Sequence, residues 1–263
     1  MKELKVYKKK DSDKTLVKIK DVIFNDGSFN LIAGPCSIES YESLEEIAKL
    51  IKKNKGRIIR GGTYKLRTSP YTFQGIGSEA VDFLHEIGKK YNLITVSEIP
   101  SLLELDLFIE KIDIIQVGAR NMDNYPLLTA LGHTKKPIIL KRGPAATIEE
   151  WLNAAEYILD GGNDQVILCE RGIKTFETYT RNTLDLSSVL AIRKLSHLPV
   201  IIDPSHGTGR ADMVLDFTKI AKFMESDGAI IEIHKEPEKA LSDGFQTIDF
   251  EEYERLVDQL WKK

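Results

Sequence analysis

Residues 137–159 read PIILKRGPAATIEEWLNAAEYIL and contain one complete strand–loop–helix unit. The run 137–141 is short and mostly apolar with β-branched residues, which is typical of a buried strand. After a polar loop, Thr147 precedes apolar residues spaced three and four apart, and Thr147 with Glu150 forms a capping box. The segment therefore predicts a strand followed by an amphipathic helix.

The same unit recurs along the chain. Apolar strands are predicted at 30–33, 58–60, 94–97, 114–117, 137–141, 165–169, 200–203 and 229–233. Helical patterns alternate with them near 40–51, 78–91, 101–109, 124–132, 147–158, 184–196, 212–225 and 249–261. Short strands without internal charge that alternate with helices are typical of a parallel sheet buried on both faces.

Eight such units predict an α/β fold, the closed (β/α)8 TIM barrel, with an open doubly wound sheet as the alternative. The segment 15–29 alternates in polarity and contains a turn at Asn25-Asp26-Gly27, which predicts a short N-terminal β-hairpin. The chain has no linker or low-complexity stretch. We therefore expect one barrel domain over residues 1–263, in which 1–29 form the N-terminal extension and hairpin.

The composition excludes several classes of protein. The chain has 263 residues, of which 42% are hydrophobic and 29% charged, with 2 Cys, so it is not a disulfide scaffold, a collagen or a disordered chain. A net charge of −3 gives no reason to expect nucleic acid or a membrane as the main partner. Without a signal peptide or an apolar run of about 18 residues, a cytoplasmic protein with reduced cysteines is expected.

Arginine is concentrated where a barrel has its active site, in the loops after the carboxyl ends of the strands. The chain has 27 Lys but only 10 Arg, and seven of these Arg lie in such loops: Arg60, Arg67, Arg120, Arg142, Arg171, Arg181 and Arg210. The guanidinium group binds phosphate and carboxylate through two parallel hydrogen bonds. The cluster predicts a small polyanionic substrate, although pairing with acids on helix surfaces would account for one or two of the seven.

Four potential metal ligands follow strands of the first, seventh and eighth units, which become neighbours when a barrel closes. They are Cys36, His206, Glu232 and Asp243. One thiolate, one imidazole and two carboxylates suit a divalent metal of the Mn, Fe, Co or Zn class. Taken singly, each has an ordinary structural explanation, such as packing for Cys36 and a turn for Asp243.

Other motifs narrow the chemistry further. Gly75-Ile76-Gly77 lacks the third glycine of a dinucleotide fingerprint and does not follow a strand, and no Walker loop occurs, so no nucleotide cofactor is expected. Lys65 and Lys141 would lie among arginines, which should lower the pKa of both amines and suit them to proton donation or nucleophilic attack.

On its motifs the chain resembles the metal-dependent 3-deoxy-7-phosphoheptulonate synthases (DAHP synthases), in the small subgroup related to the 3-deoxy-8-phosphooctulonate synthases. The resemblance covers about residues 30 to 245. The motifs that carry it are Gly34-Pro35-Cys36-Ser37, Arg60-Gly61-Gly62 through Ser69-Pro70-Tyr71, Gly118-Ala119-Arg120, Lys141-Arg142-Gly143, Asp203-Pro204-Ser205-His206-Gly207-Thr208-Gly209 and Ala240-Leu241-Ser242-Asp243-Gly244.

The resemblance implies a transferase of the shikimate pathway to aromatic amino acids. Such an enzyme condenses phosphoenolpyruvate with D-erythrose 4-phosphate and yields 3-deoxy-D-arabino-heptulosonate 7-phosphate and phosphate. The resemblance also implies one divalent metal ion, phosphorylated small-molecule substrates and a homo-oligomer, either a dimer or a tetramer.

Site residues are carried over from the family by their position in its motifs. The implied metal ligands are Cys36, His206, Glu232 and Asp243. Phosphoenolpyruvate would be bound by Arg60, Lys65, Gly118, Ala119, Arg120, Lys141 and Arg171. The aldose phosphate would be bound by Arg67, Thr68, Ser69 and Asp203. The implied catalytic residues are Lys65, His206, Cys36 and Glu98, with Glu98 near the attacking water.

Three alternatives stay open. Octulosonate synthases, which use arabinose 5-phosphate, usually carry an Asn-Arg-Ser-Ser-type segment after the lysine of the second loop. Here the segment is 65–70, KLRTSP, which favours the four-carbon aldose even though Leu66 replaces the usual proline. A Schiff-base aldolase that uses Lys141, or a barrel that only binds anions, would belong to other functional classes.

Members of this family also occur with a fused regulatory or chorismate mutase domain. The roughly 29 residues before the first predicted strand are too few for either domain. We therefore expect a bare catalytic core without the fused-domain route to feedback inhibition.

Overall fold

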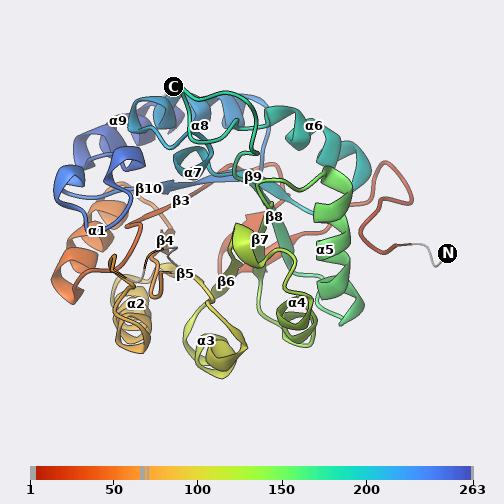
Figure 1. Cartoon of the computed structure of the whole chain (residues 1–263), viewed down its shortest axis with the longest axis horizontal. Helices are drawn as coiled ribbons and strands as arrows, with labels where there is room; N and C mark the ends of the chain where they lie inside the picture. The colour runs from red at the N-terminus through yellow and green to blue at the C-terminus, as the bar shows by residue number, and fades with distance from the viewer. Residues whose placement is uncertain (1–3, 66–68, 70, 262–263) are drawn as a thin grey trace.

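The eight predicted strands form a closed parallel barrel (Figure 1). The computed structural model describes residues 4–65, 69 and 71–261. The barrel strands are β3 (Asn30–Gly34), β4 (Ile58–Arg60), β5 (Ile94–Glu98), β6 (Ile114–Val117), β7 (Ile138–Lys141), β8 (Val166–Glu170), β9 (Val200–Ile202) and β10 (Gly228–Glu232). Because β10 pairs with β3 in register from Gly228↔Asn30 to Glu232↔Gly34, the barrel prediction is confirmed and the open sheet is excluded.

Helices form the outer ring (Figure 1). They are α1 (Tyr41–Lys53), α2 (Ser78–Tyr91), α3 (Leu105–Lys111), α4 (Tyr125–Gly132), α5 (Ile148–Asp160), α6 (Leu186–Leu195), α8 (Val214–Phe223) and α9 (Phe250–Trp261). The capping box predicted at Thr147 and Glu150 is present at the start of α5. One further short helix, α7 (Pro204–Thr208), was expected to be a loop and carries His206.

The predicted hairpin is present, but its turn lies elsewhere. Strands β1 (Val17–Ile19) and β2 (Val22–Phe24) pair in an antiparallel sheet of their own, so the chain reverses at Lys20 and Asp21. Lys20 takes the left-handed conformation that this tight turn needs, with φ of 52°. Residues 25–27, expected to be the hairpin turn, instead form a bend after β2, where Asn25 and Gly27 have positive φ angles of 71° and 96°. The Asn25 amide donates there to the carbonyl oxygens of Thr15 and His197.

The hairpin closes the amino-terminal end of the barrel. Its apolar side chains cluster with Ile, Val and Cys side chains from inside the barrel: Val17, Ile19, Val22 and Phe24 with Ile32, Ile58, Ile94, Val96, Ile114, Ile139, Ile167, Cys169, Ile201 and Ile230. A larger apolar cluster lies between the strands and the ring of helices. Because these side chains fill the barrel interior at its amino-terminal end, a binding site is expected at the carboxyl-terminal mouth.

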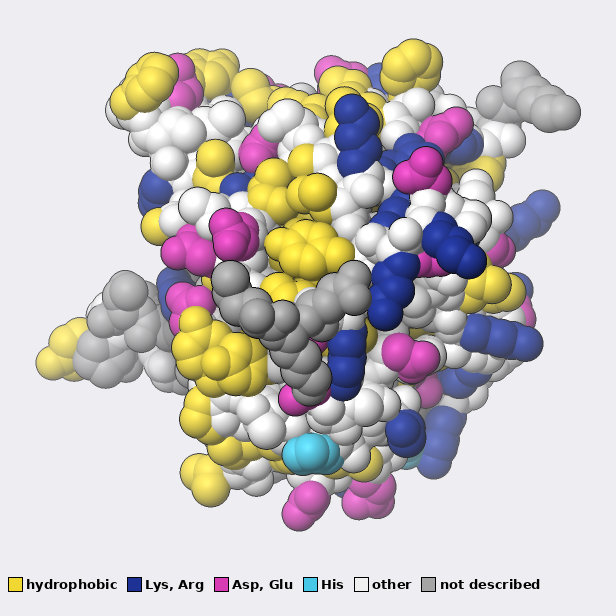
Figure 2. All heavy atoms as spheres, turned by 90° about the vertical axis from the view of Figure 1, so that its right-hand side faces the viewer, with side chains coloured by type: hydrophobic (Ala, Val, Ile, Leu, Met, Phe, Trp, Pro, Cys, Tyr) yellow, Lys and Arg dark blue, Asp and Glu magenta, His cyan; other side chains and the backbone are white. Residues whose placement is uncertain are grey.

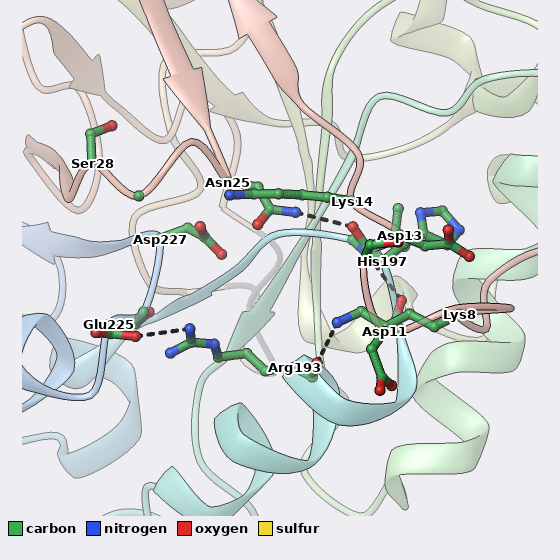
Figure 3. A pocket seen from close by; sticks show the side chains of 15 residues that line it. Lys8, Asp11, Asp13, Lys14, Asn25, Ser28, Arg193, His197, Glu225 and Asp227 are labelled. Carbon is green, nitrogen blue, oxygen red and sulfur yellow. Dashed lines mark hydrogen bonds and ion pairs between the residues drawn. The ribbon is translucent and has the colours of Figure 1, made fainter.

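A cavity of about 400 Å³ lies at the amino-terminal end, beside the hairpin (Figure 3). Its polar groups join the N-terminal segment to the ends of α6 and α8. The Lys8 ammonium donates to the carbonyl oxygen of Arg193 at 2.7 Å, and the Arg193 guanidinium pairs with Glu225 at 3.0 Å. The wall of this cavity is therefore explained by packing of the extension onto the barrel.

The outer surface is mixed in charge. On the face that carries α5, Lys and Arg side chains are interspersed with Asp, Glu and hydrophobic groups (Figure 2). Among the helices of the described residues, none has the length and apolarity that crossing a membrane requires.

Candidate active site

A cavity of about 310 Å³ opens at the carboxyl-terminal mouth of the barrel. Nine of the residues implied by the motifs line it: Arg60, Lys65, Glu98, Ala119, Arg120, Lys141, Arg171, His206 and Asp243. Each lies at or after the end of a strand, so the closed barrel brings together side chains from seven different strand ends. The wall also contains Arg181 from the predicted arginine cluster, and residues to which sequence reasoning gave no role in the site: Gly62, Tyr64, Pro144, Lys174 and Asn182.

Only part of the predicted arginine cluster faces this cavity. Arg60, Arg120, Arg171 and Arg181 line it. Arg142 instead pairs with Glu170 and Asp185, and Arg210 pairs with Asp212. The prediction that loop arginines face one mouth was thus wrong for these two. Both form ion pairs, but Glu170 is a buried residue of β8 and not one of the helix-surface acids considered as the alternative.

Three of the four predicted metal ligands converge beneath the cavity. One ligand atom each of Cys36, Glu232 and Asp243 lies within 4.8 Å of the others, and the Cys36 thiol lies 3.1 Å from Oδ2 of Asp243. The fourth, His206, joins them through Nε2, which lies 3.3 Å from Oε1 of Glu232. The donor set of sulfur, nitrogen and carboxylate oxygens matches the requirements of a divalent metal of the Zn, Fe, Co or Mn class.

The contacts of His206 also fit a metal site. Its Nδ1 lies 2.8 Å from Oδ2 of Asp203, and since a carboxylate only accepts hydrogen bonds, the ring proton lies on Nδ1. Burial lowers the pKa of His206, although the charges of Asp203 and Glu232 oppose this shift, and on deprotonation the ring keeps its remaining proton on Nδ1. The lone pair of Nε2 then faces a carboxylate oxygen, and a cation between these two acceptors would satisfy both.

Asp203 connects His206 to Lys141. Its carboxylate is 1% exposed and accepts from the Lys141 ammonium at 2.5 Å as well as from the backbone N–H of His206 at 2.9 Å. Burial raises the pKa of Asp203, but the charges of His206 and Lys141 outweigh it and hold the pKa well below its usual value. The predicted contact of Asp203 with the aldose phosphate stays a prediction; the observed contacts orient His206 and Lys141.

Arg60 and Glu232 form a buried ion pair under the cavity. The Arg60 guanidinium donates to Oε1 of Glu232 at 2.8 Å and to the carbonyl oxygen of Pro35 at 3.0 Å. Burial raises the pKa of Glu232, but the charges of His206, Arg60 and Lys65 overcome this and lower it to about 2. Glu232 is therefore an ionised carboxylate that is ready to bind a cation.

Lys65 lies beside one of the predicted metal ligands. Its ammonium is 3.7 Å from Oδ2 of Asp243. Burial lowers the pKa of Lys65, but Cys36, Glu232 and Asp243 raise it more than Arg60 lowers it, so the net shift is upward. The expected fall in this pKa was wrong for Lys65, because the loop brings the amine to the metal-ligand cluster.

Glu98 is held by two neighbours that sequence reasoning did not single out as its supports. The Gln116 amide donates to Oε2 of Glu98 at 2.8 Å from the paired position on β6. A Cβ atom at Gly118 would lie 2.2 Å from Oε1 of Glu98, so the carboxylate packs where a side chain would be. Gln116 follows two apolar residues of β6, and a lone polar residue inside a buried strand is the signal that could have revealed it.

The aldose-phosphate segment is described only in part. Arg67, Thr68 and Leu66 lie outside the described residues. Ser69 is described, and its Oγ accepts from the backbone N–H of Tyr71 at 3.4 Å. The roles predicted for this segment stay predictions.

Comparison with known proteins shows the family to which this chain belongs. The family model described as the DAHP synthetase I family matches residues 9–263. A phospho-2-dehydro-3-deoxyheptonate aldolase of Thermotoga maritima is 49% identical over 248 residues, which cover 94% of this chain and 73% of that protein. A 2-dehydro-3-deoxyphosphooctonate aldolase of Bartonella henselae is 29% identical over 264 residues, covering 93% of this chain and 94% of that protein.

Two solved structures have the same fold. The crystal structure of the Thermotoga maritima phospho-2-dehydro-3-deoxyheptonate aldolase (DAHP synthase) superposes with a TM-score of 0.95 at 47% identity, covering 98% of this chain and 76% of that one. A truncated form of the 3-deoxy-D-arabino-heptulosonate 7-phosphate synthase from the same organism gives a TM-score of 0.91 at 45% identity, covering 98% of this chain and 94% of that one.

Proposed function

Because the chain belongs to the DAHP synthetase I family, we propose that it condenses phosphoenolpyruvate with erythrose 4-phosphate. The products are 3-deoxy-D-arabino-heptulosonate 7-phosphate and inorganic phosphate. The observation that carries the proposal is one cavity at the barrel mouth, where cationic side chains lie beside a cluster of thiol, imidazole and carboxylate groups. These cationic residues, called the cationic wall below, are Arg60, Lys65, Arg120, Lys141, Arg171, Lys174 and Arg181. Binding of two phosphorylated substrates explains why the wall is cationic. Activation of an aldehyde by a metal ion explains why potential metal ligands lie beside it.

The cationic wall binds the substrate anions. Arg171 is 9% exposed and Lys141 is 4% exposed, so both present their charges in a site from which most water is excluded. Together with Arg60 and Arg120 they suit the phosphate and carboxylate of phosphoenolpyruvate. Holding two mutually repelling anions in contact is a large part of such a catalysis.

Cys36, His206, Glu232 and Asp243 would hold the divalent metal. When bound there, the metal would polarise the aldehyde oxygen of the aldose as a Lewis acid. Asp203 contributes by holding the proton on Nδ1 of His206 and leaving Nε2 to bind the metal. Arg60 contributes by holding Oε1 of Glu232 at 2.8 Å.

The chain's own residues also move the protons. C3 of the enol attacks the aldehyde carbon, and the Lys65 ammonium donates a proton to the resulting alkoxide. Water then adds to the cationic C2 and gives up a proton to Glu98. The bond between C2 and the phosphate oxygen then breaks, the C2 hydroxyl gives its proton to the departing phosphate, and the ketone of the product remains.

The direct test is a phosphate-release assay with phosphoenolpyruvate and either erythrose 4-phosphate or arabinose 5-phosphate. We expect turnover with the four-carbon aldose and a much lower kcat/KM with the pentose. A preference for arabinose 5-phosphate would instead indicate the octulosonate synthase activity named for the 29% identical relative.

Removal of metal is predicted to abolish the activity. Exhaustive dialysis against a chelator should leave a folded, inactive protein, and addition of a single metal of the Mn, Fe, Co or Zn class should restore turnover. Activity that survives chelation, together with inactivation by borohydride and substrate, would favour a Schiff base at Lys141. We expect no borohydride trapping, because the Lys141 ammonium is held by the Asp203 carboxylate at 2.5 Å.

Substitution of Gly118 by alanine should damage catalysis while leaving the barrel intact. The added Cβ would lie 2.2 Å from Oε1 of Glu98, and the flexible end of that side chain must move. Displacement of a catalytic group by about 1 Å costs roughly a hundredfold in rate, so we expect a fall in kcat of that order. Steady-state kinetics and a thermal melt together would check this.

Gly143→Ala is the matched control for Gly118→Ala. Gly143 lies in the loop after β7, but its added Cβ would have its nearest contact at 3.4 Å, with Ala146. We expect its kcat to stay within about twofold of the wild type, because 3.4 Å is an ordinary van der Waals distance and no neighbour has to move, although the position is buried. Equal losses in the two variants would argue against the placement of Glu98.

Cytoplasmic localisation and a homo-oligomeric state remain predictions. Both fit an enzyme of small phosphorylated metabolites, and sedimentation of the purified protein would measure the second.

A further inference from the structure

We propose that Gln246 is a positioning residue that holds Glu232 in place for the metal and connects it to Arg181 in the cationic wall. The inference deepens the proposed function and rests on the metal site assigned there. Neither Gln246 nor the connection to Arg181 follows from the motifs that identify the four ligands.

Gln246 lies between two groups of opposite charge. It is 2% exposed, its Nε2 donates to Oε2 of Glu232 at 2.6 Å, and its Oε1 accepts from the Arg181 guanidinium at 3.2 Å. A carboxylate can only accept hydrogen bonds and a guanidinium can only donate them, so the partners determine the orientation of the amide. The amide of glutamine has both a donor and an acceptor and is long enough to contact both partners. A glutamate at this position would place a second carboxylate against Glu232.

The backbone around Gln246 is fixed to the strand that carries Glu232. Gln246 ends the 3-10 helix Gly244–Gln246, which begins directly after Asp243. Two residues beyond Gln246, the backbone N–H of Ile248 donates to the carbonyl oxygen of Glu232 at 3.1 Å. The segment therefore presents Asp243 and Gln246 to the site as one unit held against β10.

This segment has little freedom to shift. Asp243 adopts a left-handed conformation with φ of 50°, which costs a residue with a Cβ and persists only where the surroundings enforce it. A Cβ at Gly244 would lie 2.2 Å from the carbonyl oxygen of Pro237, so this position accepts glycine only. A short, constrained segment is a suitable support for a group that must hold another side chain still.

The two oxygens of Glu232 are held by different partners. Oε1 receives the Arg60 guanidinium and faces Nε2 of His206 at 3.3 Å, whereas Oε2 receives the Gln246 amide. The amide thus stops the carboxylate from rotating and leaves Oε1 toward His206. Without this hydrogen bond Oε2 loses the amide that holds it, and we expect the geometry of the carboxylate as a metal ligand to loosen.

The other side of the amide reaches the substrate wall. The Arg181 side chain is 45% exposed, lines the cavity and lies 3.9 Å from Oδ1 of Asp243. Gln246 accepts from this guanidinium and so keeps it beside the metal-ligand cluster while its remaining N–H groups stay available to an anion. Loss of Gln246 should therefore affect metal affinity first and the KM of a phosphorylated substrate second.

The test compares four variants by metal affinity, measured through competition of Mn²⁺ or Zn²⁺ with a chromogenic chelator. Gln246→Met keeps the length without the amide, and Gln246→Asn keeps the amide but withdraws it by one methylene. Both should bind metal about 10- to 100-fold more weakly than the wild type. Arg181→Met should keep wild-type metal affinity within about threefold and raise the KM of the aldose phosphate. Gln259→Met, on the exposed face of α9, should change neither quantity.

Wild-type metal affinity in both Gln246 variants would overturn the proposal. If Gln246→Met does not fold, Gln246→Asn still gives the answer, because its smaller amide remains compatible with the site. Metal affinity is measured without turnover. A wild type that binds metal but releases no phosphate would therefore contradict the proposed function. A difference in metal affinity between the Gln246 variants and that wild type would still support the role of Gln246.

Discussion

Cys36→Ala is expected to abolish tight metal binding and to lower kcat by about a thousandfold or more, which corresponds to about 4 kcal/mol of transition-state stabilisation. The reason lies in the cluster beneath the mouth, where the thiol is one of three ligand groups within 4.8 Å of each other. The barrel should remain folded, because the substitution removes a single atom whose loss costs about 1 kcal/mol. Metal content after gel filtration and the phosphate-release assay would measure both effects.

The second cysteine provides the control. Cys169 is fully buried among apolar side chains in the barrel interior, and it is absent from the ligand cluster. Cys169→Ala should reduce stability by about 1 kcal/mol but keep metal and activity. Full activity in Cys36→Ala would refute its assignment as a ligand, and a loss of metal in both variants would point to a general loosening of the barrel.

Asp203→Asn should damage both catalysis and stability. The carboxylate accepts from the Lys141 ammonium at 2.5 Å and from Nδ1 of His206 at 2.8 Å, and all three groups are mostly buried. In the variant only one oxygen remains. If it accepts from the backbone N–H of His206, the amide NH₂ faces the Lys141 ammonium and Nδ1 of His206 and drives the ring proton to Nε2, where the metal should bind. If it accepts from Lys141 and Nδ1, the NH₂ opposes the backbone N–H of His206 and displaces that residue. Errors of this kind in a histidine tautomer cost up to about 10⁴-fold in kcat in an enzyme that uses an analogous aspartate–histidine pair.

Stability should fall because the variant leaves a buried cation without its partner. Breaking a buried ion pair from one side costs about 3–5 kcal/mol, and Lys141 is 4% exposed. Denaturant unfolding of the metal-free protein would measure this cost without any contribution from metal binding. An Asp203→Asn variant as stable as the wild type would contradict the ion pair as described.

Asp185→Asn is the matched comparison. Asp185 also pairs with a buried cation, Arg142, but Glu170 contacts the same guanidinium at 3.0 Å. The guanidinium therefore keeps one carboxylate when Asp185 is neutralised, and we expect a smaller loss of stability and little change in kcat. Similar losses in the two aspartate variants would indicate that the activity effect of Asp203→Asn comes from general destabilisation.

The elements of the barrel were predictable because their signals are local. A strand such as 114–117 is recognisable from a few consecutive apolar residues, and α5 from its capping box and apolar spacing. The two errors also have local causes. The helix Pro204–Thr208 is too short for a helical period to appear, and the hairpin turn at Lys20 and Asp21 lacks the glycine that usually marks one.

The candidate site was predictable in part. The ligand cluster and the cationic wall contain residues that follow strands, so the barrel topology alone brings them to one end. Gln116 and Gln246 were missed because their importance lies in contacts with Glu98 and Glu232, 18 and 14 positions away. A neutral amide has no intrinsic signal in a sequence until its partners are known.

By itself, then, the sequence determined the (β/α)8 architecture and the set of reactive groups at its mouth, because strand periodicity and motif residues are properties of neighbouring positions. Only the tertiary structure decided which arginines face the cavity, that Lys65 lies beside Asp243, and that Asp203 and Gln246 hydrogen-bond to His206 and Glu232, two of the proposed metal ligands. Those outcomes depend on distances between side chains from different strands, and such distances arise only when the barrel has closed.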